Sequence, residues 1–282
     1  MKLIDSDNYA ASGIEAFFFP GGEPHARIPE NFGDALLYLK ARTWNDVGLG
    51  MMVLDALYAQ NVKRRWLFVP YFPGARQDRT DMQTPQTAKY MLSLFWYSAN
   101  KVYTFDAHSD VVAHKTLNFM PSDLNINGYF DPGYTVIVPD AGAKNRCLSF
   151  ARAINNSDKL LQCDKKRNFA TGKFEGFTMP PLPGPGKYLI VDDICDGGGT
   201  FNLLAQEFKK DQYAKDSELS LWVSHGIFSK GVGNIDPIIE DVYTTDSWFR
   251  NLVGYPTDHP TLVTLKPLID RILLTALAQE GF

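Results

Sequence analysis

The sequence is poor in cysteine, with only Cys147, Cys163 and Cys195 and no pair spaced as Cys-x-x-Cys. An odd, scattered set argues against a disulfide framework and against a zinc site, and it fits a reducing compartment. No apolar stretch approaches the ~20 residues that cross a bilayer. The N-terminus also lacks the basic-then-apolar order of a signal peptide. We therefore expect a cytoplasmic protein that has no membrane partner.

The sequence also lacks a strong charge of either sign. Its 28 lysines and arginines against 32 aspartates and glutamates give a formal charge of −4 over 282 residues. This mild acidic excess gives no reason to expect a nucleic-acid partner. Hydrophobic residues make up 45% and charged residues 21%, a balance that excludes disordered and fibrous classes. At ~150 residues per domain the length corresponds to one large or two modest domains.

Short apolar runs alternate with amphipathic segments along the chain. Continuous apolar or β-branched runs predict strands covered on both faces, at 16–19, 66–69, 101–105, 135–138, 159–162, 188–191, 219–223 and 241–243. Helical spacing of apolar residues predicts helices around 49–57, 88–95, 147–154, 201–208 and 265–273. Strand–helix alternation predicts an α/β fold with mostly parallel sheets flanked by helices.

Two irregular segments divide this pattern. The polar stretch 120–133 predicts a passage between two domains, which we place at 1–125 and 126–282. The stretch 179–186 contains four prolines, which remove hydrogen-bond donors and fix φ. We expect it to be a mobile surface loop.

The most informative segment is VDDICDGGGT at 191–200, because a buried strand there ends in two carboxylates before a glycine turn and a helix. Asp192 and Asp193 are suited to accept hydrogen bonds from the hydroxyls of a ribose diol. Convergent N–H groups of a glycine turn and a helix N-terminus can bind a phosphate. The alternative is a tight connection with Asp196 as a turn residue and Thr200 as a cap. Three aspartates within five positions favour function.

This segment resembles the 5-phosphoribosyl-binding signature of the type I phosphoribosyltransferase superfamily. Further motifs resemble one branch of it, the ribose-phosphate pyrophosphokinases (PRPP synthetases), and they occur in the family's order: FPGGE at 19–23, ND at 45–46, PYFPGARQDR at 70–79, TFDAH at 104–108, VPDAG at 138–142, DKKR at 164–167 and SHGIFS at 224–229. The resemblance covers most of the chain and implies two phosphoribosyltransferase-like domains.

The resemblance implies Mg²⁺-dependent transfer of the diphosphoryl group of ATP to the anomeric hydroxyl of ribose 5-phosphate, giving PRPP and AMP. It also implies the site residues: for ATP, Phe19, Gly22, Glu23, Arg76, Gln77, Arg79 and His108; for the metal, His108 and Asp140; for catalysis, Lys165 and Arg167; for the ribose phosphate, Asp192, Asp193, Asp196, Gly197, Gly198, Gly199 and Thr200. Lys165 and Arg167 are expected in a mobile loop that continues into the proline-rich stretch. Because the family's equivalent of 19–23 reaches a neighbouring subunit, a homodimer or larger homo-oligomer is expected.

The sequence departs from the family pattern at Gly197, where the family has a threonine. This removes a hydroxyl from the 5-phosphate pocket and leaves room for a substituent. The alternative acceptor is therefore a larger 5-substituted ribose such as ADP-ribose, giving ADP-ribose 1-pyrophosphate. A non-catalytic PRPP-synthetase-associated protein and a phosphoribosyltransferase that releases pyrophosphate are both disfavoured, because the ATP and catalytic motifs are retained. Ribose 5-phosphate is the acceptor that we predict.

Overall fold

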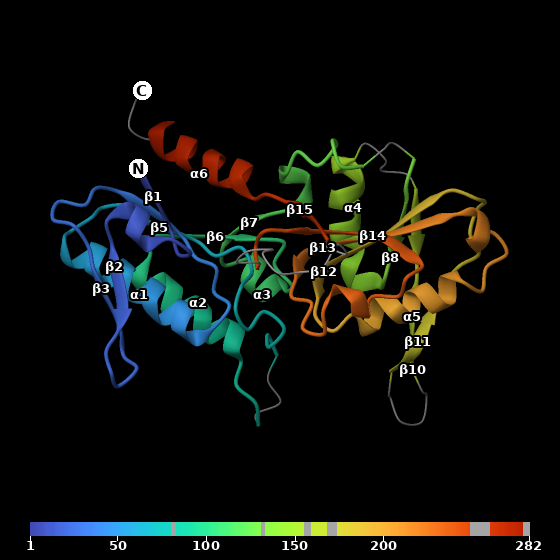
Figure 1. Cartoon of the computed structure of the whole chain (residues 1–282), viewed down its shortest axis with the longest axis horizontal. Coiled ribbons are helices and arrows are strands. Elements are labelled where there is room, and N and C mark those ends of the chain that lie inside the picture. The colour runs from blue at the N-terminus through green and yellow to red at the C-terminus, as the bar shows by residue number, and fades with distance from the viewer. Residues whose placement is uncertain (80–82, 131–132, 155–158, 168–173, 249–259, 279–282) are drawn as a thin grey trace. The chain divides into compact units, whose positions relative to one another are not determined.

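The computed structural model describes residues 1–79, 83–130, 133–154, 159–167, 174–248 and 260–278 (Figure 1). Contacts divide the chain into two compact units. The first comprises Met1–Phe119 together with the last helix, and the second comprises Met120–Leu265. The domain bounds 1–125 and 126–282 stay a prediction. The contacts group the last helix with the first unit.

The first unit contains a sheet of five parallel strands. Their order is β1 (Lys2–Asp5), β4 (Ala35–Tyr38), β5 (Arg65–Phe68), β6 (Lys101–Phe105) and β7 (Leu117–Phe119). The helices of this unit are α1 (Trp44–Ala59), α2 (Thr87–Ser98), the short α3 (Asp110–Ala113) and α6 (Lys266–Ala278), with a 3₁₀ turn η1 at Tyr9–Ser12. The predicted helices at 49–57, 88–95 and 265–273 are thus α1, α2 and α6.

Successive residues of these strands face opposite sides of the sheet. Leu37, Leu67 and Val102 pack in one hydrophobic cluster with apolar residues of α1 and α2. The other face is aromatic: Tyr38 stacks on Phe68 with ring centroids 5.4 Å apart. The central strands β4, β5 and β6 are therefore buried on both faces, which is why β5 and β6 read as continuous apolar runs.

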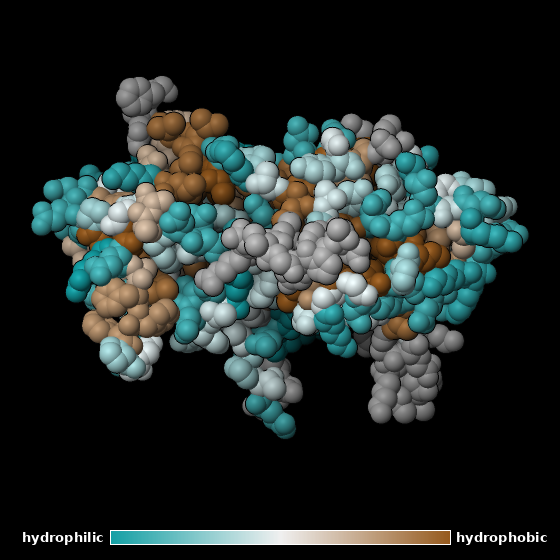
Figure 2. Space-filling model, viewed as in Figure 1, coloured by the Kyte–Doolittle hydropathy of each residue, from teal (hydrophilic) through white to brown (hydrophobic). Residues whose placement is uncertain are grey.

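Helix α6 returns to the aromatic side of this sheet. The Arg271 guanidinium lies over the Phe119 ring, 5.6 Å from its centroid, and Arg64 donates to the Ala276 carbonyl oxygen (3.3 Å). Leu274 and Leu277 are nevertheless exposed, and Figure 2 shows hydrophobic atoms gathered over α6. The helix is therefore anchored to the first unit but leaves apolar side chains on the surface.

The second unit contains a sheet of six parallel strands. Their order is β15 (Thr261–Val263), β14 (Ile239–Thr245), β13 (Glu218–Gly226), β12 (Lys187–Cys195), β8 (Thr135–Val138) and β9 (Leu160–Gln162). Two helices, α4 (Lys144–Ala153) and α5 (Gly199–Phe208), accompany the 3₁₀ turns η2 (Pro121–Asp123), η3 (Ala141–Ala143), η4 (Ala214–Asp216) and η5 (Val232–Asn234). The predicted strands and helices of this half are all present.

Helices α4 and α5 contact different residues of β12 and β13. Phe201 and Phe208 of α5 pack with Ile190 in one cluster. On α4, Phe150 packs against Trp222, with ring centroids 4.9 Å apart. Strand β12 is consequently buried on both sides, and its carboxyl end is fixed between the start of α5 and the body of α4.

Two antiparallel hairpins lie outside the parallel sheets. The predicted strand at 16–19 is β2 (Glu15–Phe18), but it pairs antiparallel with β3 (Pro24–Arg27) instead of joining the main sheet. The second hairpin pairs β10 (Asp164–Arg167) with β11 (Phe174–Thr178). Both strands of the second hairpin, together with β1, β3, β4, β7 and β15, are strands that the apolar pattern did not predict.

The proline-rich stretch 179–186 is a surface segment with fixed attachments. Leu182 is buried, and its N–H donates to the Asp211 carboxylate (3.0 Å). The Tyr188 hydroxyl donates to the Gly184 carbonyl oxygen (2.5 Å). A buried leucine and two hydrogen bonds thus attach this segment to the second unit, and its mobility stays a prediction. No helix of the described chain is long and apolar enough to cross a bilayer.

Candidate active site

A tight glycine turn joins the end of β12 to the start of α5. Gly198 has a φ of +80°, a left-handed conformation that favours glycine. A Cβ at Gly198 would lie 2.7 Å from Cδ1 of Ile235. Within the described chain no side chain caps α5, and the first N–H groups of a helix have no partner inside it. The turn and the positive end of the helix dipole are therefore suited to an anion such as a phosphate group.

Asp192 and Asp193 are held by an arginine of α4. Arg146 is 9% exposed, and its Nη1 is 3.4 Å from Oδ1 of Asp192 while its Nη2 is 3.2 Å from Oδ2 of Asp193. The Asp193 N–H donates to Asp192 Oδ1 (2.9 Å), and the Ile194 N–H donates to Asp193 Oδ1 (2.9 Å). The two carboxylates are thus fixed at the carboxyl end of the central strand, where ligands bind in open α/β sheets.

The pKa of Asp192 is raised. Burial and the neighbouring Asp193 carboxylate disfavour its charged form, and the Arg146 cation opposes them without cancelling them. Hydroxyl groups of a bound diol would add hydrogen bonds to this carboxylate and favour its ionised form. The pair is therefore suited to a neutral, polyhydroxylated ligand at this position.

Gly197 does not open an empty space. The Cδ and Cε atoms of Lys230 each lie 3.3 Å from the position that a Cβ of Gly197 would take. The side chain of Asn234 also donates to the Gly197 carbonyl oxygen (2.7 Å). The lysine side chain therefore occupies the space next to the missing side chain, which does not favour the expected room for a substituent at this point.

Asp140 caps the turn after β8 and pairs with Lys165. Its Oδ1 accepts from the N–H groups of Gly142 (2.7 Å) and Ala143 (3.2 Å), and its Oδ2 contacts the Lys165 ammonium. Burial alone would raise the pKa of Asp140. The Lys165 cation and the two N–H groups outweigh burial, so this pKa is lowered. Asp140 is consequently an ionised carboxylate at neutral pH.

Lys165 and Arg167 lie on strand β10 and not in a loop as expected. Lys165 is in register with Phe177 of β11 and Arg167 with Phe174. Phe177 is buried in the cluster beside α5, so the hairpin is anchored to the second unit by an apolar side chain. The structure describes the backbone of Arg167, and residues 168–173 lie outside the described chain. The anchored hairpin explains why the segment is a strand despite its charges.

In the first unit, four of the seven predicted ATP residues follow two adjacent strands. Arg76, Gln77 and Arg79 lie in the loop after β5, and His108 follows β6. Strands β5 and β6 pair in parallel, so both loops leave the same edge of the sheet. Gly74 in the first loop has a φ of +73°, and a Cβ there would come 2.6 Å from Cγ2 of Thr87. This close approach fixes the loop against the start of α2.

Phe19, Gly22 and Glu23 lie together in the turn between β2 and β3. The Phe19 N–H donates to the Glu23 carbonyl oxygen (2.9 Å), and the Gly22 N–H donates to the Phe19 carbonyl oxygen (2.8 Å). Phe19 is 47% exposed, and its ring centroid lies 5.3 Å from that of His25. The turn therefore presents an aromatic ring and a carboxylate, the two groups that could contact an adenine.

The structure forms no dense metal site. Among the described residues, no group of three or more histidine, cysteine, aspartate or glutamate side chains is placed to hold a metal ion. Asp140 belongs to the second unit and His108 to the first. The ionised Asp140 is a hard oxygen ligand of the type that Mg²⁺ uses, and Mg²⁺ takes few protein ligands when phosphates supply others. Asp140 by itself therefore fits a metal bound mainly through its substrate.

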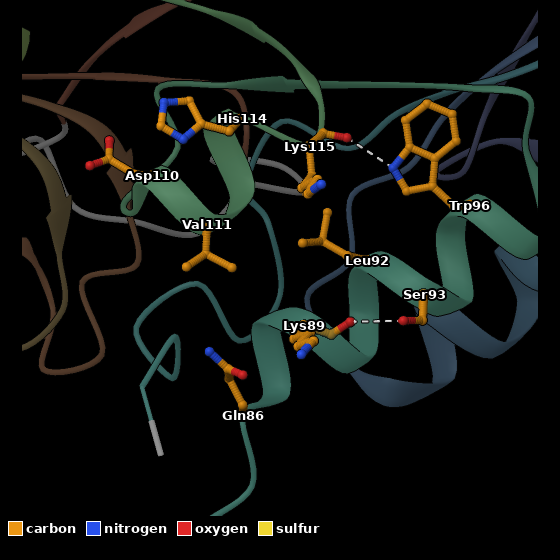
Figure 3. Close-up of a pocket in the computed structure, with 9 residues that line it drawn as sticks. All are labelled: Gln86, Lys89, Leu92, Ser93, Trp96, Asp110, Val111, His114 and Lys115. Carbon is orange, nitrogen blue, oxygen red and sulfur yellow. Dashed lines mark hydrogen bonds between the residues drawn. The ribbon is translucent and has the colours of Figure 1, made fainter. Parts of the chain in front are cut away.

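A separate cavity of about 660 Å³ lies along α2 and α3, and Figure 3 shows the residues that line it. Its lining residues are Gln86, Lys89, Leu92, Ser93, Trp96, Asp110, Val111, His114 and Lys115. The Trp96 indole N–H donates to the Lys115 carbonyl oxygen (2.9 Å) at one end. No residue that the sequence predicts for the active site lines this cavity.

Comparison with family models finds no match. Individual relatives do match. The ribose-phosphate pyrophosphokinase of Caulobacter vibrioides is 30% identical over 242 residues, which are 80% of this chain and 76% of the relative. That of Hyphomonas neptunium is 29% identical over 281 residues, covering 93% of this chain and 88% of the relative.

Among solved structures, the phosphoribosylpyrophosphate synthetase of Mycobacterium smegmatis matches with a TM-score of 0.76. The alignment covers 99% of this chain and 100% of the other, at 18% identity. This likeness confirms the predicted fold class, two phosphoribosyltransferase-like domains with mostly parallel sheets.

Proposed function

The chain belongs to the ribose-phosphate pyrophosphokinase family, and from this premise we propose that it is an enzyme of nucleotide biosynthesis that makes PRPP. It transfers the β,γ-diphosphoryl group of ATP to the anomeric hydroxyl of ribose 5-phosphate. The bond from the anomeric oxygen to the β-phosphorus forms, the bond from that phosphorus to the α-phosphate oxygen breaks, and AMP leaves. The anomeric hydroxyl releases its proton to water.

The observation that carries this proposal is the end of β12. Two arginine-held carboxylates, Asp192 and Asp193, precede a glycine turn and an uncapped helix start within the described chain. The carboxylates suit the ribose 2- and 3-hydroxyls, and the N–H groups of 196–200 suit the 5-phosphate. A ribose phosphate held at both ends has its anomeric carbon in a fixed place, as transfer requires.

ATP is assigned to the first unit. The guanidinium groups of Arg76 and Arg79 offer planar forks to phosphate oxygens, and Gln77 and His108 add polar contacts. Phe19 stacks on the adenine, and Glu23 accepts from its amino group. Glycine at position 22 permits the left-handed turn (φ +92°) that presents these two side chains.

The catalytic cations are Lys165 and Arg167. Diphosphoryl transfer concentrates negative charge around the β-phosphorus, so positioning and electrostatic stabilisation account for most of the catalysis. Lys165 lies in contact with Asp140, which holds its ammonium at one place on the hairpin. During turnover Lys165 stabilises the charge of the transferring group.

Mg²⁺ is the metal that we assign to Asp140 and His108. Bound with ATP, it would neutralise phosphate charge and polarise the β-phosphoryl group. Asp140 is ionised and caps a tight turn, so its oxygens are fixed without a cluster of further ligands.

Ribose 5-phosphate is favoured over a larger 5-substituted ribose. The named relatives are ribose-phosphate pyrophosphokinases, and Lys230 fills the space beside Gly197, on which the larger acceptor depended. The ammonium of Lys165 and the carboxylate of Asp140 also remain as a pair, which argues against a non-catalytic relative.

We further assign the protein to the cytoplasm and to a homodimer or larger homo-oligomer. Its three cysteines are free and buried, which agrees with a reducing compartment. The exposed Phe19 at the hairpin turn supports an assembly in which one subunit completes the ATP site of another. No membrane or nucleic-acid partner is assigned.

The experiment is an end-point ³¹P NMR assay with ATP and Mg²⁺, run in parallel with ribose 5-phosphate and with ADP-ribose. AMP and a new diphosphate ester in the first tube alone are expected. The same signals only with ADP-ribose would overturn the acceptor. AMP in neither tube, with a protein whose circular dichroism and melting curve show it to be folded, would overturn the reaction.

A further inference from the structure

The loop that follows β13 is fastened to the phosphate-binding turn. The Ser229 N–H donates to the Asp196 carbonyl oxygen (3.1 Å). Asn234 donates to the Gly197 carbonyl oxygen (2.7 Å), and Asn202 of α5 donates to the Asn234 carbonyl oxygen (2.8 Å). These bonds cross between two segments that are more than 30 residues apart in sequence. The loop is therefore connected by hydrogen bonds to both the turn and the start of α5.

Lys230 lies on this loop, between two fixed residues. The Ser229 N–H is bonded to the turn, and the Gly231 N–H donates to the Phe228 carbonyl oxygen (2.8 Å). The Cγ, Cδ and Cε atoms of Lys230 lie 3.3–3.6 Å from the position of a Cβ at Gly197. The end of this exposed side chain therefore passes beside the turn at Gly197.

The ammonium of Lys230 is available for a ligand. Within the described chain, no carboxylate or other group forms a hydrogen bond or ion pair with it. Nearby lysines differ: Lys209 is paired with Asp236, and Lys210 with Glu207. A lysine side chain that packs its methylene groups and keeps its charge free is arranged for binding an anion.

The turn itself lacks a side chain that a phosphate dianion could use at position 197. Backbone N–H groups and the helix dipole supply only partial positive charges. A full cation at hydrogen-bond range strengthens phosphate binding because charge-assisted hydrogen bonds are about twice as strong as neutral ones. The missing side chain at Gly197 leaves room for the methylene groups of Lys230 beside the turn.

We propose that Lys230 binds the 5-phosphate of the ribosyl acceptor and determines the preference for a phosphorylated ribose. This inference rests on the proposed function and deepens it. The hydroxyl that is absent at Gly197 is replaced by an ammonium from a different loop.

The test is the Lys230→Met variant, which keeps an unbranched apolar side chain and removes the charge. The Michaelis constant for ribose 5-phosphate is expected to rise about 10- to 100-fold, while that for ATP changes less than about twofold. Calorimetric binding of ribose 5-phosphate should weaken by a similar factor. Lys215→Met, which removes an exposed lysine from η4, is the matched control and should change neither constant.

The outcomes separate the two proposals. If the unaltered protein does not form PRPP from ribose 5-phosphate, the proposed function fails. If it does, and Lys230→Met leaves the Michaelis constant for ribose 5-phosphate unchanged, Lys230 is not a phosphate ligand. Equal losses in ATP and ribose 5-phosphate affinity would also overturn the inference. Lys230→Gln, with a neutral polar side chain, provides a second variant if the first does not fold.

A double-mutant cycle tests the packing. Gly197→Ala alone forces the Lys230 methylene groups to shift, whereas Gly197→Ala in a Lys230→Ala background meets open space. The cost in affinity for ribose 5-phosphate should therefore be smaller in that background, a non-additive result. Strictly additive effects would contradict the contact.

Discussion

Arg146 is the cation on which the two aspartates at the end of β12 depend. It is buried and contacts both carboxylates. Removing one partner of a buried ionic cluster leaves an uncompensated charge and is more costly than removing the whole cluster. Arg146 therefore matters for stability as well as for the position of the ribose-binding carboxylates.

We predict that Arg146→Met destabilises the protein by about 3–5 kcal/mol near neutral pH. The pKa of Asp192 in the folded protein lies above the ordinary value of 3.8. The protonated carboxyl therefore stabilises the folded state in full below about pH 4, and this stabilisation is lost as the pH rises through the pKa of the folded protein. Without Arg146 that pKa rises further. The loss in melting temperature should therefore be larger at pH 8 than at pH 5.

The measurement is thermal unfolding of both proteins at the two pH values. Arg152→Met is the control, because Arg152 lies on the same helix but is exposed, and it should cost less than about 1 kcal/mol. A destabilisation by Arg146→Met that is equal at pH 5 and pH 8 would contradict the electrostatic cause.

At the residue scale, the sequence alone identifies functional residues that are adjacent in one motif. Asp192, Asp193 and the glycine turn stand next to each other, so their joint chemistry is visible without a structure. Arg146 and Lys230 were not predicted, because each reaches the site from a different segment. Nothing in the string around Arg146 distinguishes it from a surface arginine of an amphipathic helix, although its position among buried residues of α4 is a weak signal.

At the scale of elements, the strand–turn–helix of β12 and α5 imposes different demands on its glycines. Gly198 has a positive φ and lies against Ile235, whereas Gly199 has no positive φ and no described heavy atom within 4 Å of the position that a Cβ would take. Only the first requires glycine on conformational grounds. The turn is therefore constrained at one position and permissive at the next.

We predict that Gly198→Ala destabilises the protein by about 2 kcal/mol or more, from the left-handed backbone and the contact with Ile235. Gly199→Ala, in the first turn of α5, should leave the melting temperature unchanged or raise it slightly, because alanine is the better helix former. Differential scanning calorimetry of the two variants measures this difference. Equal melting temperatures would show that the turn adopts another conformation in solution.

Apolar runs predicted most of the buried strands, but they missed β4, which is buried throughout, and both strands of the β10–β11 hairpin. Strands such as 66–69 and 188–191 are apolar throughout because helices cover both faces of their sheets. The hairpin strands β10 and β11 are charged or glycine-containing, so their composition indicates a loop. The packing of Phe177 into the second unit anchors this segment as a hairpin, and that contact is not local.

At the scale of the whole molecule, the chain does not divide at a single point. Helix α6 follows the second unit in sequence but packs with the first, through Arg271 and the Ala276 carbonyl oxygen. Hydrophobic spacing identified the helix, but spacing states only that one face is buried and not which sheet buries it. Sequence periodicity therefore cannot predict that α6 packs on the first unit.

The expected assembly makes a prediction at this scale. If the turn carrying Phe19 and Glu23 completes the ATP site of a neighbouring subunit, each active site uses residues from two chains. A Phe19→Ala/Glu23→Ala variant and a Lys165→Ala variant should each lose nearly all turnover when expressed alone. Light scattering should show that both are dimers or larger, like the unaltered protein.

Co-expression of the two variants should restore activity. In a mixed dimer, one site carries both defects. The other site takes its intact Phe19–Glu23 turn from the Lys165→Ala chain and its intact Lys165 from the chain with the altered turn. At random assortment half of the dimers are mixed and each has one intact site, so about a quarter of the normal activity is expected. If the turn served its own subunit, every site would carry one defect and no activity would return. Because both variants keep the second unit's phosphate turn intact, a recovery can only come from residues that complement each other across subunits.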